Sequence, residues 1–234
     1  MIFIKKIIYT FLTPRWVNVY KNFNRNFVKN DDKKILFYIF SKFWFMPHTY
    51  VYKYWHKANI SSKHYYREFL ALDHNARMLI KKVQKHSSKS SKVLDLGCNI
   101  GRHLNELRRQ GYNNLYGVDI GKIAIAKSKE IFPNLKKVKT VCSSFEEYLF
   151  KTQKNFFDLI YTHGATVELV KPTFPLISQL SRVLINGGYM VFIIDEDGHS
   201  YPRFWRYEFK LNNLSIIFKK KINTKTLFVL KKVK

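Results

Sequence analysis

The sequence predicts an α/β fold: a doubly wound, mostly parallel sheet with helices on both faces and a C-terminal antiparallel hairpin. From residue 93 onward, short apolar segments alternate with segments of helical periodicity. Polar or glycine-containing turns separate them, a pattern typical of parallel strands joined by helical crossovers. With 234 residues, 46% of them hydrophobic, the chain has enough apolar material for one such domain and a short extension.

The first expected elements are a helix and a linker. Apolar residues recur at helical spacing within 61–86, so we expect an amphipathic helix that begins after Ser61 or Ser62. The polar segment 87–92 then leads into the first strand. Strands are expected at 93–96, 114–119, 137–142, 157–162 and 188–195, and helices at 101–111, 121–132, 144–151, 174–185 and near 201–209.

The end of the chain predicts a change of direction. Asn186-Gly187-Gly188 is expected as a turn that ends the helix before the fifth strand. Segments 214–222 and 224–234 are rich in Ile, Phe, Leu and Val and are separated by a single residue. They predict two strands of a hairpin that adds an antiparallel strand to the sheet.

Residues 1–60 differ from 61–234 and are interpreted as a separate N-terminal extension. They hold 17 of the 39 aromatic residues and 11 Lys or Arg, against two acidic residues. Their apolar stretches, 1–12 and 35–46, contain Lys and are shorter than the roughly 20 residues of a membrane span. We expect the extension either to cap one face of the domain or to lie on an anionic membrane surface. Without a signal peptide, the chain is expected in the cytoplasm, with peripheral contact at the inner membrane surface as an alternative.

The formal net charge of +26 is compatible with an anionic membrane or a nucleic acid as partner. However, 32 of the 42 basic residues are Lys, which lacks the planar fork that suits Arg to phosphate recognition. A general compositional bias toward Lys explains the charge equally well. Cys98 and Cys142 are expected to be reduced and buried, because two cysteines give neither a disulfide framework nor a metal-ligand spacing.

A glycine turn follows the first strand in the segment VLDLGCNIGRHL, residues 93–104. Gly97 and Gly101 allow the backbone to turn sharply and to approach a ligand closely. The dinucleotide pattern G-x-G-x-x-G does not fit, because positions 99 and 102 are Asn and Arg. Asp95 would repel a pyrophosphate but suits a cationic ligand, which disfavours a dehydrogenase.

The run Asp95-Leu96-Gly97-Cys98-Asn99-Ile100-Gly101 resembles motif I, D-x-G-x-G-x-G, of the class I S-adenosylmethionine-dependent methyltransferases. The resemblance covers most of residues 61–234 and implies a Rossmann-like fold with S-adenosyl-L-methionine as cofactor. Asn99 departs from the middle glycine, and Asn is a residue that accepts positive φ. The resemblance implies cofactor contacts for Asp95, Gly97, Cys98, Asn99 and Gly101.

Asp119, at the end of the second predicted strand, can accept hydrogen bonds from both ribose hydroxyls. Its alternative role is to cap the helix expected from Gly121. The resemblance implies that Ile120 packs on the adenine. It also places Ser144 and Phe145 beside the adenine, although Ser144 can equally be a helix N-cap, in a capping box with Glu147.

The resemblance further implies that the helix containing Arg67 folds over the cofactor, so that Arg67 can pair with its carboxylate. On the acceptor side, the fourth strand ends in Tyr161-Thr162-His163-Gly164 instead of the [DNS]-P-P-[YF] motif of amino-directed nucleic-acid enzymes. His163 is the first candidate for a catalytic base, and Glu168 is the second. A histidine that only hydrogen-bonds within the loop is the alternative.

These observations predict an S-adenosylmethionine-dependent methyltransferase. Its expected acceptor is a small molecule, a sugar or a lipid-linked molecule, methylated by in-line transfer to oxygen. One alternative is an RNA or protein methyltransferase that uses the basic surface. Another is a catalytically inactive binding protein with the same fold.

Overall fold

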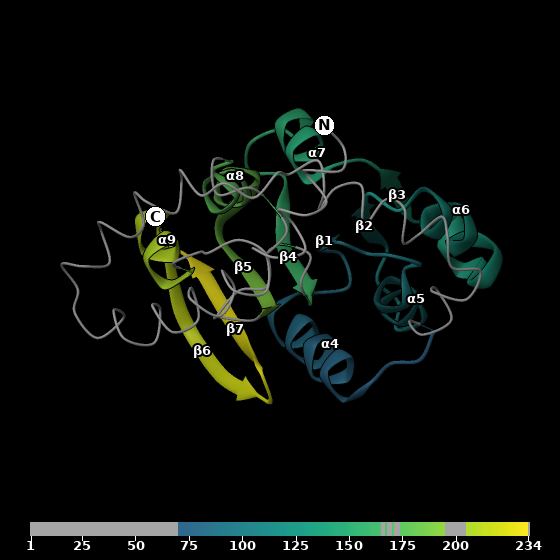
Figure 1. Ribbon diagram of the computed structural model, residues 1–234, viewed down its shortest axis with the longest axis horizontal. Coiled ribbons are helices and arrows are strands. Elements are labelled where there is room, and N and C mark those ends of the chain that lie inside the picture. The colour runs from purple at the N-terminus through teal and green to yellow at the C-terminus, as the bar shows by residue number, and fades with distance from the viewer. Residues whose placement is uncertain (1–69, 165–166, 168–169, 171–173, 195–204, 234) are drawn as a thin grey trace, which may run out of the picture.

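One seven-stranded sheet organises the chain (Figure 1). The computed structural model describes residues 70–164, 167, 170, 174–194 and 205–233. The strand order is β3-β2-β1-β4-β5-β7-β6, in which β1 to β5 run parallel and β7 pairs antiparallel with both β5 and β6. The predicted doubly wound, mostly parallel sheet with a C-terminal antiparallel hairpin is therefore confirmed.

The strands occur in the predicted order and close to the predicted bounds. They are β1 (Lys92–Leu96), β2 (Asn114–Asp119), β3 (Lys139–Cys142), β4 (Phe157–His163), β5 (Leu184–Ile194), β6 (Leu214–Ile222) and β7 (Lys225–Lys232). The chain order reverses between β1 and β4, so the loops after these strands meet at the same edge of the sheet. This switch point is where ligands bind in open α/β sheets.

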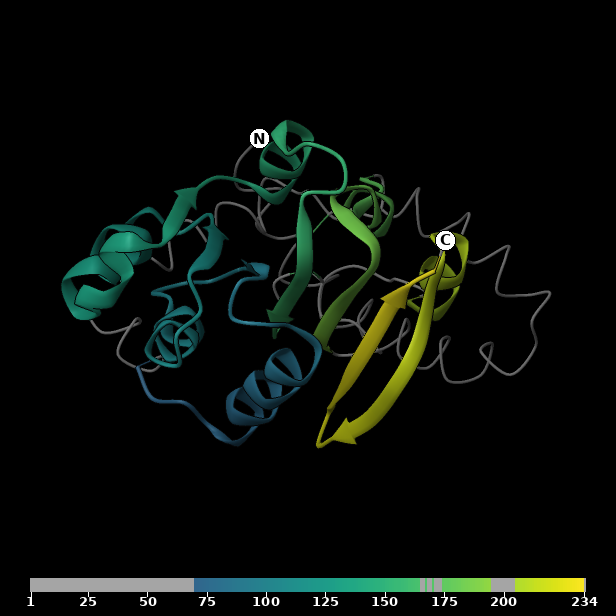
Figure 2. The same ribbon diagram turned by 180° about the vertical axis from the view of Figure 1, so that it is seen from behind.

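Helices cover both faces of the sheet (Figures 1 and 2). The core cluster on one face includes residues of α4 and α5, and the cluster on the other face includes residues of α7, α8 and α9. Because each helix buries an apolar stripe against the sheet, the two clusters form the two halves of one core. The helices are α4 (His74–His86), α5 (Arg102–Arg109), α6 (Lys122–Ile131), the 3-10 helix η2 (Pro133–Lys137), α7 (Phe145–Lys151), α8 (Leu176–Val183) and α9 (Trp205–Leu211).

The helix expected within 61–86 begins later than predicted among the described residues. Asp73 has an extended backbone, and its carboxylate accepts a hydrogen bond from the Ala76 N–H at 2.7 Å, so it is the N-cap of α4. Residues 70–73 are not helical, and residues 61–69 lie outside the described part of the chain. Leu79 and Val83, two of the periodic apolar positions, are fully buried. The periodicity was therefore a sound guide to the buried face of the helix but not to its start.

The segment around Asn186-Gly187-Gly188 is not the turn that ends α8. α8 ends at Val183, and β5 begins directly at Leu184. Gly187 has a φ of 78°, and the pairing with β4 shifts between Leu184 and Tyr189. The glycines therefore form an irregularity inside the strand instead of a separate turn.

Cys98 is buried as expected, but Cys142 at the end of edge strand β3 is exposed, because only β2 pairs with this strand.

Most of the division into an extension 1–60 and a domain 61–234 lies outside the described residues and stays a prediction. In the described ranges, no helix is both long and apolar enough to cross a membrane.

Gly117 of β2 provides a test of the packing under the glycine turn. An alanine Cβ at this position would lie 2.7 Å from Leu104 Cδ1 and 2.9 Å from Cys98 Sγ. We expect Gly117→Ala to lower the free energy of unfolding by about 1–3 kcal/mol through overpacking, as measured by urea denaturation. Gly187→Ala is the control, because no atom lies within 4 Å of its Cβ and only the cost of its φ of 78° remains. A loss well below about 1 kcal/mol in Gly117→Ala would contradict this account.

Candidate active site

The glycine turn after β1 has the left-handed backbone that its sequence predicts. Gly97, Asn99 and Gly101 have φ values of 87°, 49° and 80°. Asn99 thus occupies the middle glycine position of the motif with a positive φ, as the sequence indicated. The Gly97 N–H donates to the Val118 carbonyl at 2.8 Å, and the Gly101 N–H donates to the Cys98 carbonyl at 2.7 Å. The first bond holds the turn against the end of β2, and the second closes the turn itself.

Gly101 has a second reason to be glycine. A Cβ there would lie 2.6 Å from Leu135 Cδ1, in addition to the strain of a φ of 80°. The residue is also the N-cap of α5, and no side chain caps that helix. The turn therefore brings the N-terminus of α5 close to the end of β1 without side-chain bulk between them.

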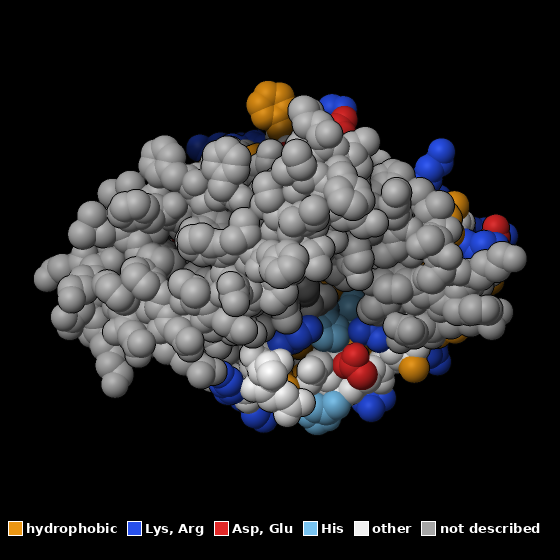
Figure 3. Space-filling view, viewed as in Figure 1, with side chains coloured by type: hydrophobic (Ala, Val, Ile, Leu, Met, Phe, Trp, Pro, Cys, Tyr) orange, Lys and Arg blue, Asp and Glu red, His pale blue; other side chains and the backbone are white. Residues whose placement is uncertain are grey.

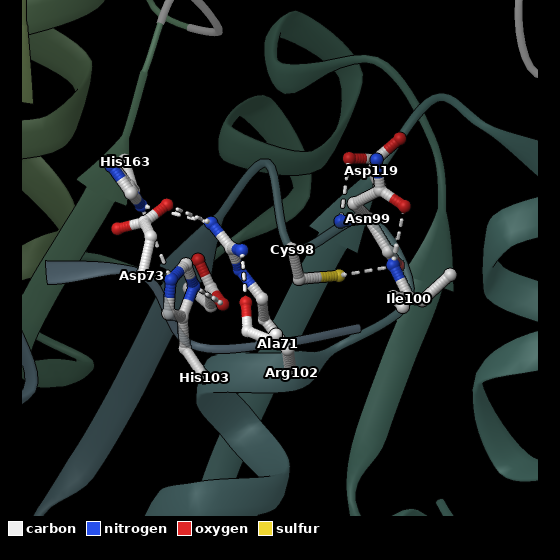
Figure 4. Close-up of polar contacts among 10 residues, drawn as sticks. Ala71, Asp73, Cys98, Asn99, Ile100, Arg102, His103, Asp119 and His163 are labelled. Carbon is white, nitrogen blue, oxygen red and sulfur yellow. Dashed lines mark hydrogen bonds and ion pairs between the residues drawn. The ribbon is translucent and has the colours of Figure 1, made fainter. Parts of the chain in front are cut away.

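Asp119 joins the loops after β1 and β2. Its carboxylate accepts a hydrogen bond from the Asn99 N–H at 2.8 Å (Figure 4). It accepts another from the Gly121 N–H at 2.7 Å. Burial raises the pKa of Asp119, and the two backbone N–H groups oppose that effect. α6 has Gly121 as its N-cap without a side-chain cap, so the alternative role of Asp119 as helix cap is not the one observed. Each carboxylate oxygen keeps a lone pair for a further donor.

Asp95 ends β1 as a completely buried carboxylate. Neither of its oxygens has a hydrogen-bond partner among the described residues. His103 from the first turn of α5 lies nearby, with its Nδ1 3.5 Å from Asp95 Oδ2. Tyr161 of β4 is also buried, and burial together with the Asp95 charge raises the pKa of its phenol, so that it stays protonated. A buried carboxylate with unused acceptor sites suits a cationic ligand.

His163, the predicted catalytic residue, lies at the end of β4 within a polar cluster (Figure 4). Its Nδ1 is 3.3 Å from His103 Nε2 and 3.4 Å from Arg102 Nη2. Arg102 in turn donates to the Ala71 carbonyl at 2.6 Å and lies 3.3 Å from Asp73 Oδ2. The cluster therefore connects the start of α4, the start of α5 and the end of β4.

The electrostatics of the cluster keep His163 neutral. Burial lowers the pKa of His163 to about 3, and the neighbouring His103, Arg102 and Lys225 act in the same direction, against the opposing charge of Asp73. At neutral pH the imidazole is thus an uncharged hydrogen-bonding group. Figure 3 shows histidine side chains beside basic and acidic side chains on the described part of this face.

The structure gives the remaining predicted site residues local roles. Ser144 is the N-cap of α7 and accepts from the Glu147 N–H at 3.2 Å, whereas the Glu147 carboxylate contacts the Ser143 hydroxyl and does not complete a capping box. Phe145 packs into the core, and Ile120 is half-buried beyond Asp119. Their contact with an adenine stays a prediction. Arg67 and Glu168 lie outside the described residues.

The sequence did not reveal two members of this site, Asp73 and Lys225. Asp73 pairs with Arg102 only because α4 and α5 begin at the same edge of the sheet. Lys225 lies beside the loop after β4 only because β7 inserts between β5 and β6. His103 could be identified as a site residue from the sequence, because it falls in the first helical turn after the glycine motif.

Comparisons with known proteins agree with this geometry. Residues 94–192 match the model of a family described as a methyltransferase domain. No curated protein matches the chain by sequence.

Solved structures share the fold. A TehB-like S-adenosylmethionine-dependent methyltransferase from Corynebacterium glutamicum is 20% identical, with a TM-score of 0.54 over 67% of this chain and 87% of that one. One from Mesorhizobium loti is 13% identical, with a TM-score of 0.56 over 69% and 100%. Haemonchus contortus phosphoethanolamine N-methyltransferase 1, in complex with phosphoethanolamine and S-adenosylhomocysteine, is 14% identical, with a TM-score of 0.63 over 80% and 49%.

The sheet order, the glycine turn and the matched family define a class I S-adenosylmethionine-dependent methyltransferase. Residues 94–192 form the methyltransferase domain of this chain, and its cofactor is S-adenosylmethionine. The residues at this site fit S-adenosylmethionine. The unpartnered carboxylate of Asp95 suits its positive charge, Asp119 retains acceptor sites for hydroxyl groups, and a Cβ would obstruct the turn at Gly101.

Asp119 provides the test of the cofactor site. In Asp119→Asn the amide NH2 must face the N–H of either Asn99 or Gly121, which loses one hydrogen bond and weakens the acceptor for the ribose. We expect S-adenosylhomocysteine affinity, measured by isothermal titration calorimetry, to fall by about tenfold to a hundredfold.

Asp158→Asn is the matched control for Asp119→Asn. The Asp158 carboxylate also accepts from a backbone N–H, that of Lys92 at 2.6 Å, but on β4 away from the glycine turn. This variant should lose some stability and keep cofactor affinity. A parallel loss of affinity in both variants would show that destabilisation, and not the cofactor contact, explains the result.

Proposed function

We propose that the enzyme methylates an oxygen atom of a small-molecule, sugar or lipid-linked acceptor. The observation that carries the proposal is the position of His163 at the end of β4, on the acceptor side of the cofactor loop. The [DNS]-P-P-[YF] motif that orients an amine acceptor does not occur there, which favours oxygen over an exocyclic amine. The cofactor supplies an activated methyl group, so the protein chiefly has to position the acceptor in line and exclude water.

Different residues hold the cofactor and contact the acceptor. Asp95, Asp119 and the turn from Gly97 to Gly101 hold the cofactor. His163 contacts the acceptor, and its lowered pKa suits it better to holding the acceptor than to removing a proton. Glu168 remains the second candidate for a base.

Labelled cofactor tests the acceptor class. Supplied with methyl-labelled S-adenosylmethionine and cell-extract fractions, the full chain should label the small-molecule, sugar or lipid fraction. Asp119→Asn should transfer little label, because it binds the cofactor weakly. Label in the RNA or protein fraction would instead support the alternative that uses the basic surface. Cofactor binding without transfer to any fraction would point to a binding protein.

The charge of the chain bears on its partners. We also propose that it works in the cytoplasm, with peripheral contact to an anionic membrane. The support is the net charge of +26 and the Lys-rich composition. Binding to vesicles that contain anionic phospholipid should weaken with added salt, whereas equal binding to neutral vesicles would contradict the proposal.

The pKa of His163 generates a prediction for the pH profile. With a pKa of about 3, His163 is uncharged throughout pH 5–8, because its protonated form accumulates only below that pKa. The rate of methyl transfer should therefore show no step near pH 6.5 that depends on His163. A step in that range that disappears in His163→Gln would contradict the depressed pKa.

A further inference from the structure

Lys225 lies at the ligand-binding edge of the sheet. β7 begins at this residue, and the next one, Thr226, pairs with Ile194 at the carboxyl end of β5. A Cβ on Gly164, in the loop after β4, would lie 3.6 Å from Lys225 Nζ. The ammonium group therefore lies beside the loop that begins directly after His163.

The sheet register places Lys225 and His163 on the same face. His163 pairs with Ile193, and Ile193 pairs with Leu227. Ile193 and Leu227 belong to the core cluster on the α4 face of the sheet. Lys225 precedes Leu227 by two residues and shares its face, because side chains alternate along a strand.

The Lys225 charge has no counter-ion in the described part of the chain. Lys225 is half-buried, and it makes no hydrogen bond or ion pair there. Asp73 already pairs with Arg102 and caps α4, and Asp95 lies on β1, separated from β7 by β4 and β5. A partly desolvated ammonium without a partner is costly, and an anionic ligand would offset this cost.

The contact of His163 with Arg102 favours one of the two tautomers of the imidazole. A guanidinium group only donates hydrogen bonds, so His163 Nδ1, 3.4 Å from Arg102 Nη2, is an acceptor. A neutral imidazole with an unprotonated Nδ1 carries its hydrogen on Nε2. His163 thus presents an N–H donor at Nε2, which suits an acceptor atom of a ligand.

We propose that Lys225 and the Nε2–H of His163 bind an oxyanion, a carboxylate or phosphate group, of the methyl acceptor. This inference rests on the proposed function and narrows its acceptor to an anionic one. The cofactor's own carboxylate is a poor candidate for the ligand of Lys225. β4 and β5 lie between β7 and β1, the strand that carries Asp95 and the glycine turn.

Anion binding to the cofactor-loaded enzyme tests the proposal. The full chain is saturated with S-adenosylhomocysteine and titrated calorimetrically with inorganic phosphate and, separately, with acetate, at about 0.15 M chloride. At least one of the two anions should bind. Its affinity should fall by about tenfold or more in Lys225→Gln, because an ionised donor is lost. The anion that binds with the higher affinity identifies the class of oxyanion.

Two further variants serve as controls. Lys231→Gln removes a lysine from the same strand and face but at the opposite end of β7, and it should bind the anion as the unmodified protein does. His163→Gln keeps an N–H donor and should bind more tightly than His163→Leu.

The experiment distinguishes failure of the proposed function from failure of the anion site. Failure of S-adenosylhomocysteine to bind, seen before any anion is added, overturns the proposed function itself. With that ligand bound, three results overturn the anion site: neither anion binds, Lys225→Gln binds as well as the unmodified protein, or the anion displaces S-adenosylhomocysteine. Nitrogen-15 NMR gives an independent readout, in which a proton on His163 Nδ1 instead of Nε2 would also overturn it.

Discussion

The carboxylate of Asp119 is the contact on which the cofactor site depends. Its two oxygens accept from the Asn99 and Gly121 N–H groups, which belong to the loops after β1 and β2. Together with the backbone bonds from the Gly97 and Cys98 N–H groups to the Val118 carbonyl, this side chain sets the separation of the loops. The left-handed backbone of the glycine turn makes the contact possible, because it directs the Asn99 N–H toward β2. A charged acceptor binds such donors about twice as strongly as a neutral one.

A second set of contacts links the cofactor side to the acceptor side. His103 lies between Asp95 and His163, with ring nitrogens 3.5 Å and 3.3 Å from their polar atoms. Arg102, the preceding residue, connects His163 to the N-cap of α4. Two consecutive residues of α5 therefore reach both a motif I carboxylate and the end of β4. Any shift of the glycine turn would move α5 and disturb both sides together.

The sequence predicted the parts of this arrangement that depend on local spacing. Alternating strand and helix patterns indicated the parallel sheet, and the positive φ of Asn99 followed from its place in the motif. Contacts that depend on register or on strand order could not be predicted. The approach of Lys225 to Gly164 requires β7 to insert beside β5, and the pairing of Asp73 with Arg102 requires α4 to begin at His74. Periodicity alone placed that beginning too early, because it does not register an N-cap.

Burial of the Asp95 and Lys225 charges costs free energy of folding, and ligand binding can offset this cost. A fully buried carboxylate without a hydrogen bond lowers the stability of the folded chain by about 1–3 kcal/mol, and by more when it is charged. Lys225 adds a smaller cost of the opposite charge, since it is only half-buried. The two charges cannot neutralise each other, because β4 and β5 lie between their strands. A ligand of opposite sign would offset the cost of each charge. Such a pair favours a cationic cofactor on the β1 side and an anionic acceptor on the β7 side.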